Sequence, residues 1–252
     1  MQLVEVFGLR LFTRGLQSAV SQVSSAVRGD SLVVVFTPNP EQVVFASKHR
    51  SFFEVLRTAD ILLPDGVGIV IAAAIRGVRL ARIPGRVFVT RFLAELNQHE
   101  DQVGVMFVGG KEGVADKAAQ RVSEDYPKLV VCSNSGSQDV QHETIAEWQE
   151  VLQIVRSAKP KILIAGFGAP KQEFWIHRHK AELEQEGVRV VIAAGGTVDV
   201  LAGTLLAPPK ILEYMGLEWC WRLAQQPWRW RRQLALIAFV KLMISSSSLE
   251  KR

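Results

Sequence analysis

The sequence predicts an α/β protein in which helices flank a mostly parallel sheet. Apolar runs without alternation, such as SLVVVFT (31–37) and VGVMFVGG (103–110), are typical of strands covered on both faces. Helix-length stretches separate these runs, and this alternation is the pattern of βαβ units. We therefore expect a Rossmann-like sheet, followed by a basic, tryptophan-rich helical appendage at the C-terminus.

Turn residues divide the chain into its expected elements. Pro40 suits the first turn of a helix, Gly77 stops one, and Pro127 closes another. In order, the expected elements are strand 31–37, helix 41–59, the short strand and turn DILLPDG (60–66), helices 67–77 and 87–100, strand 103–110, helix 111–126, strand 129–136, helix 142–158, strand 161–168, a helix from about Gln172 to Glu186, and strand 189–196.

Length and composition limit the class of protein. A chain of 252 residues, 48% hydrophobic and 22% charged, has room for one α/β domain with an appendage. Cys132 and Cys220 are its only cysteines and have no CxxC spacing, which argues against a zinc site and a disulfide framework. We expect free thiols in a reducing compartment.

Two further patterns bear on location. The N-terminus MQLVEVFGLRLF lacks the basic and apolar regions of a signal peptide, and no run reaches the roughly 20 apolar residues of a transmembrane helix. We expect a cytoplasmic protein, held peripherally on the inner face of the cell membrane if its C-terminal segment binds lipid.

The C-terminal segment concentrates the charge. Residues 208–252 contain eight Lys or Arg and three Glu, so their net charge of +5 equals that of the whole chain. Four of the six tryptophans also lie there. Basic and aromatic residues together favour an anionic membrane surface. The alternatives are a packed helix with snorkelling arginines and a site for single-stranded nucleic acid.

The segment ILIAGFGAPKQEFW (162–175) predicts a ligand site. Its apolar run ends in glycines and Pro170, after which Lys171, Gln172 and Glu173 follow directly. Ligands bind beyond the carboxyl ends of strands in open parallel sheets, where this polar cluster would lie. Asp65 follows a second apolar run in the same way, so several loops at one sheet edge would share the site.

Each candidate also has a purely structural interpretation. The Gly109 and Gly110 amides are placed to bind a diphosphate, or they form a plain strand–helix turn. Asp65 and Asn39 suit turns, and Thr37 suits a helix N-cap. No DxD-type carboxylate pair stands in a plausible place for a divalent ion, so we expect no metal and no cofactor.

The chain resembles the WecG/TagA/CpsF family of inverting glycosyltransferases. The matching segments occur in family order and span nearly the whole chain: TPNPEQV (37–43), LLPDGVG (62–68), RIPG (82–85), GFGAPKQEFW (166–175), GGTVDVLAG (195–203) and GLEWCWRLAQQPWRWRRQ (216–233). The resemblance implies metal-independent transfer of an N-acetylmannosamine-type sugar from a UDP donor. Its usual acceptor is N-acetylglucosamine on a polyprenyl diphosphate, and the products serve cell-surface polysaccharides.

Matching positions imply roles for individual residues. Asp65 resembles the general base, and Thr37 and Gln172 are the other catalytic candidates. The expected substrate-binding residues are Asn39, Arg82, Gly109, Gly110, Gly168, Pro170, Lys171, Glu173, Gly196, Arg222, Arg229 and Arg232. Two positions depart from the family pattern: Val87 stands where Asp is frequent, and Leu206 where Arg is frequent.

Chemistry and resemblance together define the expected organisation. Residues 1–205 would form the catalytic domain, and 206–252 a membrane-associating appendage that completes the donor site. Asp65 would take the acceptor proton, and arginines would bind the departing diphosphate. The alternative from another class is a non-enzymatic nucleotide- or nucleic-acid-binding module that uses the basic tail. We expect no nucleic-acid partner, and homo-oligomerisation is left open.

Overall fold

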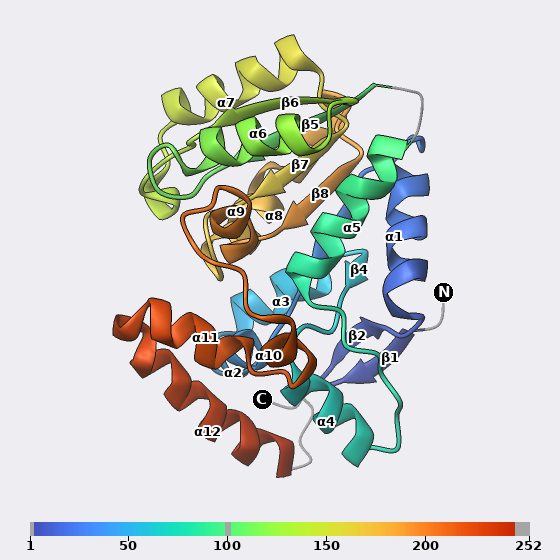
Figure 1. Ribbon diagram of the computed structural model, residues 1–252, viewed down its shortest axis with the longest axis vertical. Helices are drawn as coiled ribbons and strands as arrows, with labels where there is room; N and C mark the ends of the chain where they lie inside the picture. Colours follow the sequence, from blue (N-terminus) through green and yellow to red (C-terminus); the bar gives the residue numbers. More distant parts are fainter. Residues whose placement is uncertain (1–2, 99–101, 245–252) are drawn as a thin grey trace.

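The computed structural model describes residues 3–98 and 102–244 and confirms the α/β fold class (Figure 1). Its eight-stranded sheet has the order β1-β2-β4-β3-β8-β7-β5-β6. All neighbouring pairs are parallel except β1 (Leu3–Val6) with β2 (Leu9–Phe12). The other strands are β3 (Val33–Phe36), β4 (Ile61–Leu62), β5 (Val103–Val108), β6 (Leu129–Asn134), β7 (Ile162–Ala165) and β8 (Val190–Ala193).

The N-terminal hairpin was not predicted. Phe7 and Gly8 connect β1 to β2 with φ angles of 58° and 78°, the signs of a two-residue hairpin turn. Turns of this kind usually contain Asn-Gly, which accepts positive φ angles. Phenylalanine seldom adopts a positive φ, so the sequence Phe-Gly does not indicate a turn. The helix α1 (Gly15–Ala26) follows, and β2 joins the sheet beside β4.

Five predicted helices are confirmed, with small shifts at their ends. Their bounds are α4 (Val67–Ile75), α5 (Gly85–Gln98), α6 (Val114–Asp125), α7 (Ile145–Ala158) and α8 (Lys171–Gln185). The short 3-10 turn η1 (Val140–His142) precedes α7. Positions 99 and 100, included in the expected helix 87–100, lie outside the described residues.

The single helix expected over 41–59 is wrong. The segment forms α2 (Pro40–Lys48) and α3 (Arg50–Arg57), separated by His49 in an extended conformation with φ −130° and ψ 94°. α2 buries Val43, and α3 buries Phe52 and Leu56. An uninterrupted helix would place the apolar faces of the two halves on opposite sides, so the break lets both face the core.

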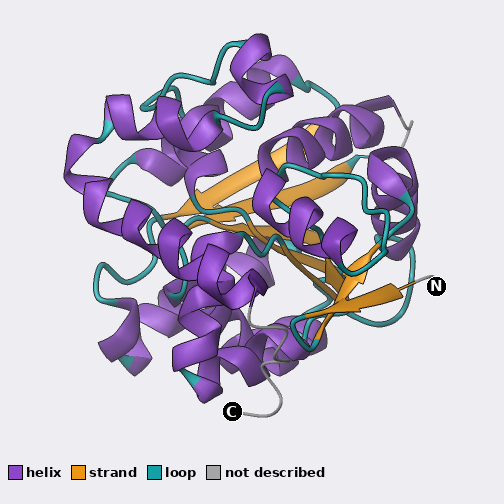
Figure 2. Cartoon of the chain, turned by 90° about the horizontal axis from the view of Figure 1, so that it is seen from below, coloured by secondary structure: helices purple, strands orange, loops and turns teal. Residues whose placement is uncertain are grey.

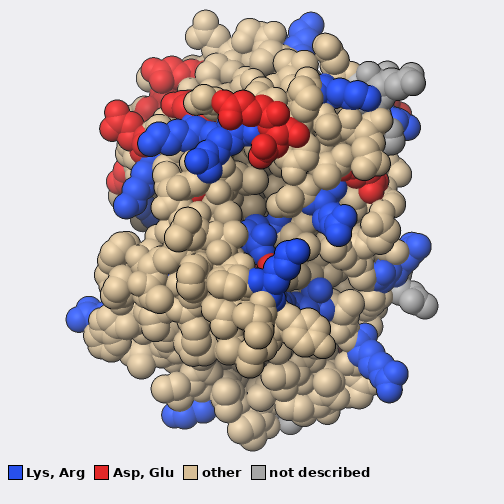
Figure 3. Space-filling model, in the orientation of Figure 1, with Lys and Arg blue, Asp and Glu red and all other residues tan. Residues whose placement is uncertain are grey.

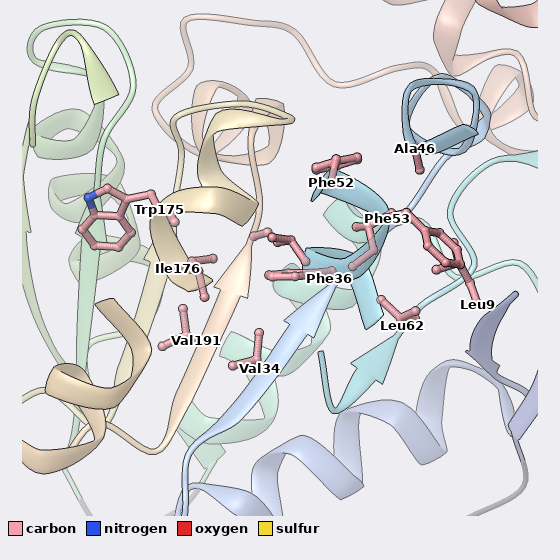
Figure 4. Close-up of a cluster of buried hydrophobic side chains, with 14 of the residues drawn as sticks. Leu9, Val34, Phe36, Ala46, Phe52, Phe53, Leu62, Trp175, Ile176 and Val191 are labelled. Atoms are coloured by element: carbon pink, nitrogen blue, oxygen red, sulfur yellow. The ribbon is translucent and has the colours of Figure 1, made fainter. Parts of the chain in front are cut away.

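The sheet is buried on both faces, as its unbroken apolar strands predict. Along β3, Val34 and Phe36 pack on one face and Val35 on the other, because successive side chains alternate. Figure 4 shows the first of these faces, where Phe36 and Val34 lie near Phe52 and Val191. Because both faces of the sheet are covered, loops reach solvent at the edge formed by the carboxyl ends of the strands.

The C-terminal helices pack against the α/β part. They are α10 (Lys210–Tyr214), α11 (Glu218–Gln225) and α12 (Trp230–Ile244), with α9 (Gly196–Leu201) before them and η2 (Pro227–Arg229) between α11 and α12. α12 packs on α2, and the packed-helix interpretation holds for the face that buries Phe239 and Leu242 (Figures 1 and 2). The division at residue 205 stays a prediction.

None of the helices formed by residues 3–98 and 102–244 is long and apolar enough to cross a membrane. Cys132 and Cys220 are free thiols, as expected.

Replacing Phe239 by Ala tests the docking of α12. The Phe239 ring packs edge-on against Phe7 with centroids 5.5 Å apart and lies against Gly68. Losing a buried phenylalanine ring costs about 3–5 kcal/mol, so we expect α12 to open before the rest unfolds. Hydrogen exchange of the α12 amides measures this. Ile237→Ala, on the exposed face, is the control and should change stability by under about 0.5 kcal/mol. Equal exchange in both variants would contradict the docking role.

Candidate active site

A cleft of about 400 Å³ lies between the carboxyl edge of the sheet and the C-terminal helices. The loops after β3, β4 and β8 supply one wall, and α11 and α12 supply the other. Figure 3 shows basic side chains gathered around a hollow in this region. The predicted site residues that line the cleft are Asn39, Asp65, Gly196, Arg222, Arg229 and Arg232.

Asp65 lies in the turn after β4. Its amide donates to the Pro38 carbonyl at 3.1 Å, and its Oδ2 accepts from the Gly85 amide at 3.3 Å. Burial raises the pKa of Asp65 to about 6, and the Glu218 carboxylate adds to this, while the Gly85 amide and Arg82 oppose it. A carboxylate with a pKa near neutrality accepts a proton more readily than an ordinary aspartate, which suits a general base.

Three arginines stand on the appendage side of the cleft. Burial lowers the pKa of Arg222, and burial together with Arg222 and Arg232 lowers that of Arg229 to about 10. The buried Nε of Arg222 has no hydrogen-bond partner in the protein. Arg232 pairs with Glu41 at 3.4 Å. Arg222 and Arg229 are partly buried and Arg232 is exposed, and this cluster of positive charge matches a phosphate-bearing ligand, whose oxygens accept from guanidinium groups.

Gly196 is a close-approach position. A Cβ atom there would lie 2.3 Å from both terminal nitrogens of Arg222. A side chain at this position would displace the guanidinium, so glycine lets the loop after β8 lie directly against it. Asn39, from the loop after β3, both lines the cleft and caps α2, since its side chain accepts from the Gln42 amide at 3.1 Å.

Gln172 and Glu173 lie behind the cleft wall rather than in its lining. Gln172 Oε1 accepts from the amides of Gly168 at 3.1 Å and Gly195 at 2.9 Å. Glu173 Oε1 accepts from Gln172 Nε2 at 2.9 Å and from Gln42 Nε2 at 2.8 Å. Because Gln42 also accepts from the Asn39 amide at 3.0 Å, this buried network connects the three loops after β3, β7 and β8. Gln42 was not among the predicted site residues.

Arg82 is not part of the cleft lining, although its partner Glu218 is. It forms an ion pair with Glu218 and donates to the Glu213 carbonyl at 2.9 Å, while Arg86 pairs with the Glu213 side chain. These contacts fasten the RIPG segment to α10 and α11. Sequence reasoning missed Arg86, Glu213 and Glu218, because nothing in their local sequence shows which distant charges they meet.

The remaining candidates lie outside the cleft lining. The Thr37 side chain packs against Gly85, where an added Cβ would lie 3.1 Å from Oγ1. Gly109 and Gly110 have positive φ angles, and Gly109 packs against Phe167. Gly168 and Pro170 lie in the loop between β7 and α8, and Lys171 is the first residue of α8. Contact of all these residues with substrate stays a prediction.

The two departures from the family pattern lie in different surroundings. Val87 is on α5 and does not line the cleft. Leu206 lines it with a side chain 67% exposed. Its carbonyl accepts from Trp221 Nε1 at 3.0 Å, and its amide donates to Gln225 at 2.8 Å. The cleft rim beside α11 therefore carries an exposed apolar side chain where the family resemblance led us to expect an arginine.

Glu173→Gln tests the buried network through pH. Burial raises the pKa of Glu173 to about 7, from 4.5, and its Oε2 has no partner. Between these values the folded protein holds a proton that the unfolded chain has lost, so stability falls as pH rises from about 4.5 to about 7. The loss is on the order of 3 kcal/mol. Urea unfolding at pH 5 and 8 should show that Gln removes this component. If the free energies of unfolding of wild type and variant differed by the same amount at pH 5 and pH 8, the raised pKa of Glu173 would be contradicted.

The family described as "Glycosyl transferase WecG/TagA/CpsF family" matches residues 4–252. Three similar proteins are named N-acetylglucosaminyldiphosphoundecaprenol N-acetyl-beta-D-mannosaminyltransferase. That of Bacillus subtilis (strain 168) is 29% identical over 219 residues, covering 86% of this chain and 81% of the relative. That of Bacillus spizizenii is 29% identical, covering 83% of this chain and 78% of the relative. That of Staphylococcus aureus MRSA252 is 27% identical, covering 87% of this chain and 83% of the relative. With a match along nearly its whole length, the chain belongs to the WecG/TagA/CpsF family of glycosyltransferases.

Proposed function

We propose that this protein transfers an N-acetylmannosamine-type sugar, with inversion, from a UDP donor to N-acetylglucosamine on a polyprenyl diphosphate. One observation carries the proposal: a carboxylate of raised pKa and a cluster of incompletely neutralised arginines line the same cleft. Family membership and the printed names of the relatives support the choice of sugar and acceptor. The product serves cell-wall polymers.

The reaction assigns a role to each side of the cleft. The acceptor hydroxyl oxygen attacks the anomeric carbon of the donor, and its proton passes to Asp65. The bond from that carbon to the diphosphate oxygen breaks, and UDP leaves with the electron pair. Arg222, Arg229 and Arg232 stabilise the negative charge that develops on the diphosphate, because the guanidinium fork matches phosphate oxygens. Arg82 holds the appendage in place through Glu213 and Glu218, and its contact with substrate stays a prediction.

The acceptor places the reaction at a membrane. A polyprenyl chain stays in the bilayer, so a protein that uses it works peripherally, on the inner face of the cell membrane. Residues 206–252 act as the membrane-associating appendage and 1–205 as the catalytic domain. The tail offers basic and aromatic side chains of the kind that bind anionic lipid, including Trp228 and Trp230, which are exposed.

Asp65→Asn tests the base. The variant keeps the shape of the side chain but loses its basicity, so we expect turnover to fall roughly 100-fold or more with little change in donor binding. Because the base must be ionised, wild-type turnover should fall as pH drops through about 6. The assay uses a panel of UDP-sugars with a short-chain lipid-linked N-acetylglucosamine. Near-wild-type turnover by Asp65→Asn, with chemistry rate-limiting, would refute the assignment; no transfer by the wild type from any donor would refute the function.

Substitution of the arginines tests diphosphate binding. Replacing Arg222, Arg229 or Arg232 by Ala should cost about 1–3 kcal/mol of transition-state stabilisation, and Lys should rescue poorly. Arg231→Ala is the matched control, because Arg231 precedes Arg232 but stacks near the Trp230 ring outside the cleft lining. Measurements of kcat/KM and of UDP affinity should show the loss in the variants of Arg222, Arg229 and Arg232 but not in Arg231→Ala. Parallel losses of thermal stability and activity in all three variants would instead indicate a packing role.

A further inference from the structure

Helix α4 has two apolar faces, and only one of them is buried. Ile69, Ala72 and Ala73 face the core. On the opposite side, Val67, Ile71 and Ile75 are 38%, 46% and 62% exposed. Their i, i+4, i+8 spacing forms one stripe along the helix. Because α4 is apolar all round but packs on one side alone, its other side exposes apolar surface to water.

Helix α12 has the same construction. Phe239 and Leu242 are buried against the α/β part, while Leu234, Ile237, Val240 and Ile244 are exposed. Of the 16 large apolar side chains exposed among the described residues, 14 lie on α4 or in residues 206–244. The other two, Val130 and Ile145, belong to β6 and α7. Figure 1 shows α4 and α12 at one end of the molecule and β6 and α7 at the other.

The two helices flank the cleft. Val67 and Gly68 of α4, and Phe239 and Val240 of α12, all belong to its lining. Gly68 lies so close to Phe239 that an added Cβ would be 3.1 Å from the ring. Val67 and Val240 are both cleft-lining and exposed, so the cleft and the two apolar stripes are continuous.

The charge of this surface suits anionic lipid. Neither α4 nor α12 contains an Asp or Glu, whereas α12 carries exposed Arg231 and Lys241, and exposed Arg79 follows α4. In Figure 3 the lower end of the molecule shows basic but no acidic side chains, and acidic ones gather toward the upper end. Apolar stripes bordered by Lys and Arg are the pattern of helices that lie in a membrane interface.

We propose that α4 is a second membrane-contacting element, which binds an anionic bilayer together with α12 and sets the cleft mouth against the lipid surface. The assignment extends membrane contact from the tail to the catalytic part itself. Only the purpose of this contact, the delivery of a lipid-linked acceptor between the two helices, rests on the proposed function. The apolar and basic surface exists whatever the donor sugar.

The test is co-sedimentation of the full chain with vesicles of phosphatidylcholine and phosphatidylglycerol in a 3:1 ratio. Ile71→Ser/Ile75→Ser removes the stripe at positions outside the cleft lining, and Ile and Ser have similar helix propensities. We expect the vesicle partition coefficient to fall about ten-fold or more. The control Val130→Ser/Ile145→Ser removes exposed apolar side chains at the far end and should bind as the wild type does. Circular dichroism and thermal unfolding establish that each variant is folded.

A second measurement reports contact directly. Cysteines placed by Ile71→Cys, Val240→Cys or Val130→Cys, in a Cys132→Ala/Cys220→Ala background, carry an environment-sensitive fluorophore. Vesicles should shift the emission to the blue at Ile71 and Val240 but not at Val130. A shift at Val240 alone, or unchanged partitioning of Ile71→Ser/Ile75→Ser, would overturn the role of α4. A change only in self-association would show that a second copy covers this face. Vesicle binding without sugar transfer would refute the proposed function and leave this inference standing.

Discussion

The docking of α12 on α2 decides whether the molecule has a two-sided cleft. Asp65 belongs to the α/β part, whereas Arg222, Arg229 and Arg232 come from the C-terminal helices. Phe239 brings the two together, because its ring fills the space between Phe7 and the close-approach glycine Gly68. A larger residue at Gly68 would crowd both Pro40 and the Phe239 ring, so this close packing depends on glycine. The positive φ at Phe7 is tolerated in the same place, where its buried ring packs on Phe239 and under Arg76.

Ion pairs fasten the other end of the appendage. Arg82 with Glu218 and Arg86 with Glu213 join the start of α5 to α10 and α11. The same Glu218 carboxylate contributes to the raised pKa of Asp65, so the closed appendage acts on the ionisation of the residue it covers. The ion pairs that hold the appendage and the Asp65 carboxylate therefore belong to one electrostatic system.

A buried network carries the loops that shape the opposite wall. Glu173 and Gln172 occupy the most distinctive motif of the chain, and they bind neighbouring loops rather than the cleft. The single Oε1 of Gln172 accepts hydrogen bonds from the Gly168 and Gly195 amides, which fixes the loops after β7 and β8 relative to each other. A distinctive motif at a sheet edge can thus set the position of the loops that line a cleft.

Leu206 and Val87 differ from the residues that the family resemblance leads us to expect, and their positions decide what each difference can affect. Leu206 lies on the cleft rim beside Trp221, where its exposed side chain makes the rim apolar. Val87 lies on α5 away from the lining, so its effect on a ligand would have to pass through the packing of that helix. Only the first change is placed to alter direct contacts.

The sequence by itself determined the fold class, most helices and strands, and the loops that carry Asp65, Asn39 and Gly196, because local periodicity and turn residues encode these features. It missed the Phe7–Gly8 hairpin and the break at His49, since both depend on packing that overrides local preference. Only the tertiary structure showed that Arg222, Arg229 and Arg232 line the cleft, whereas Arg82 pairs with Glu218 and Gln172 bonds to the loops behind the cleft wall. Those distinctions arise from contacts between segments far apart in the chain, and no local pattern contains the partner of a charge.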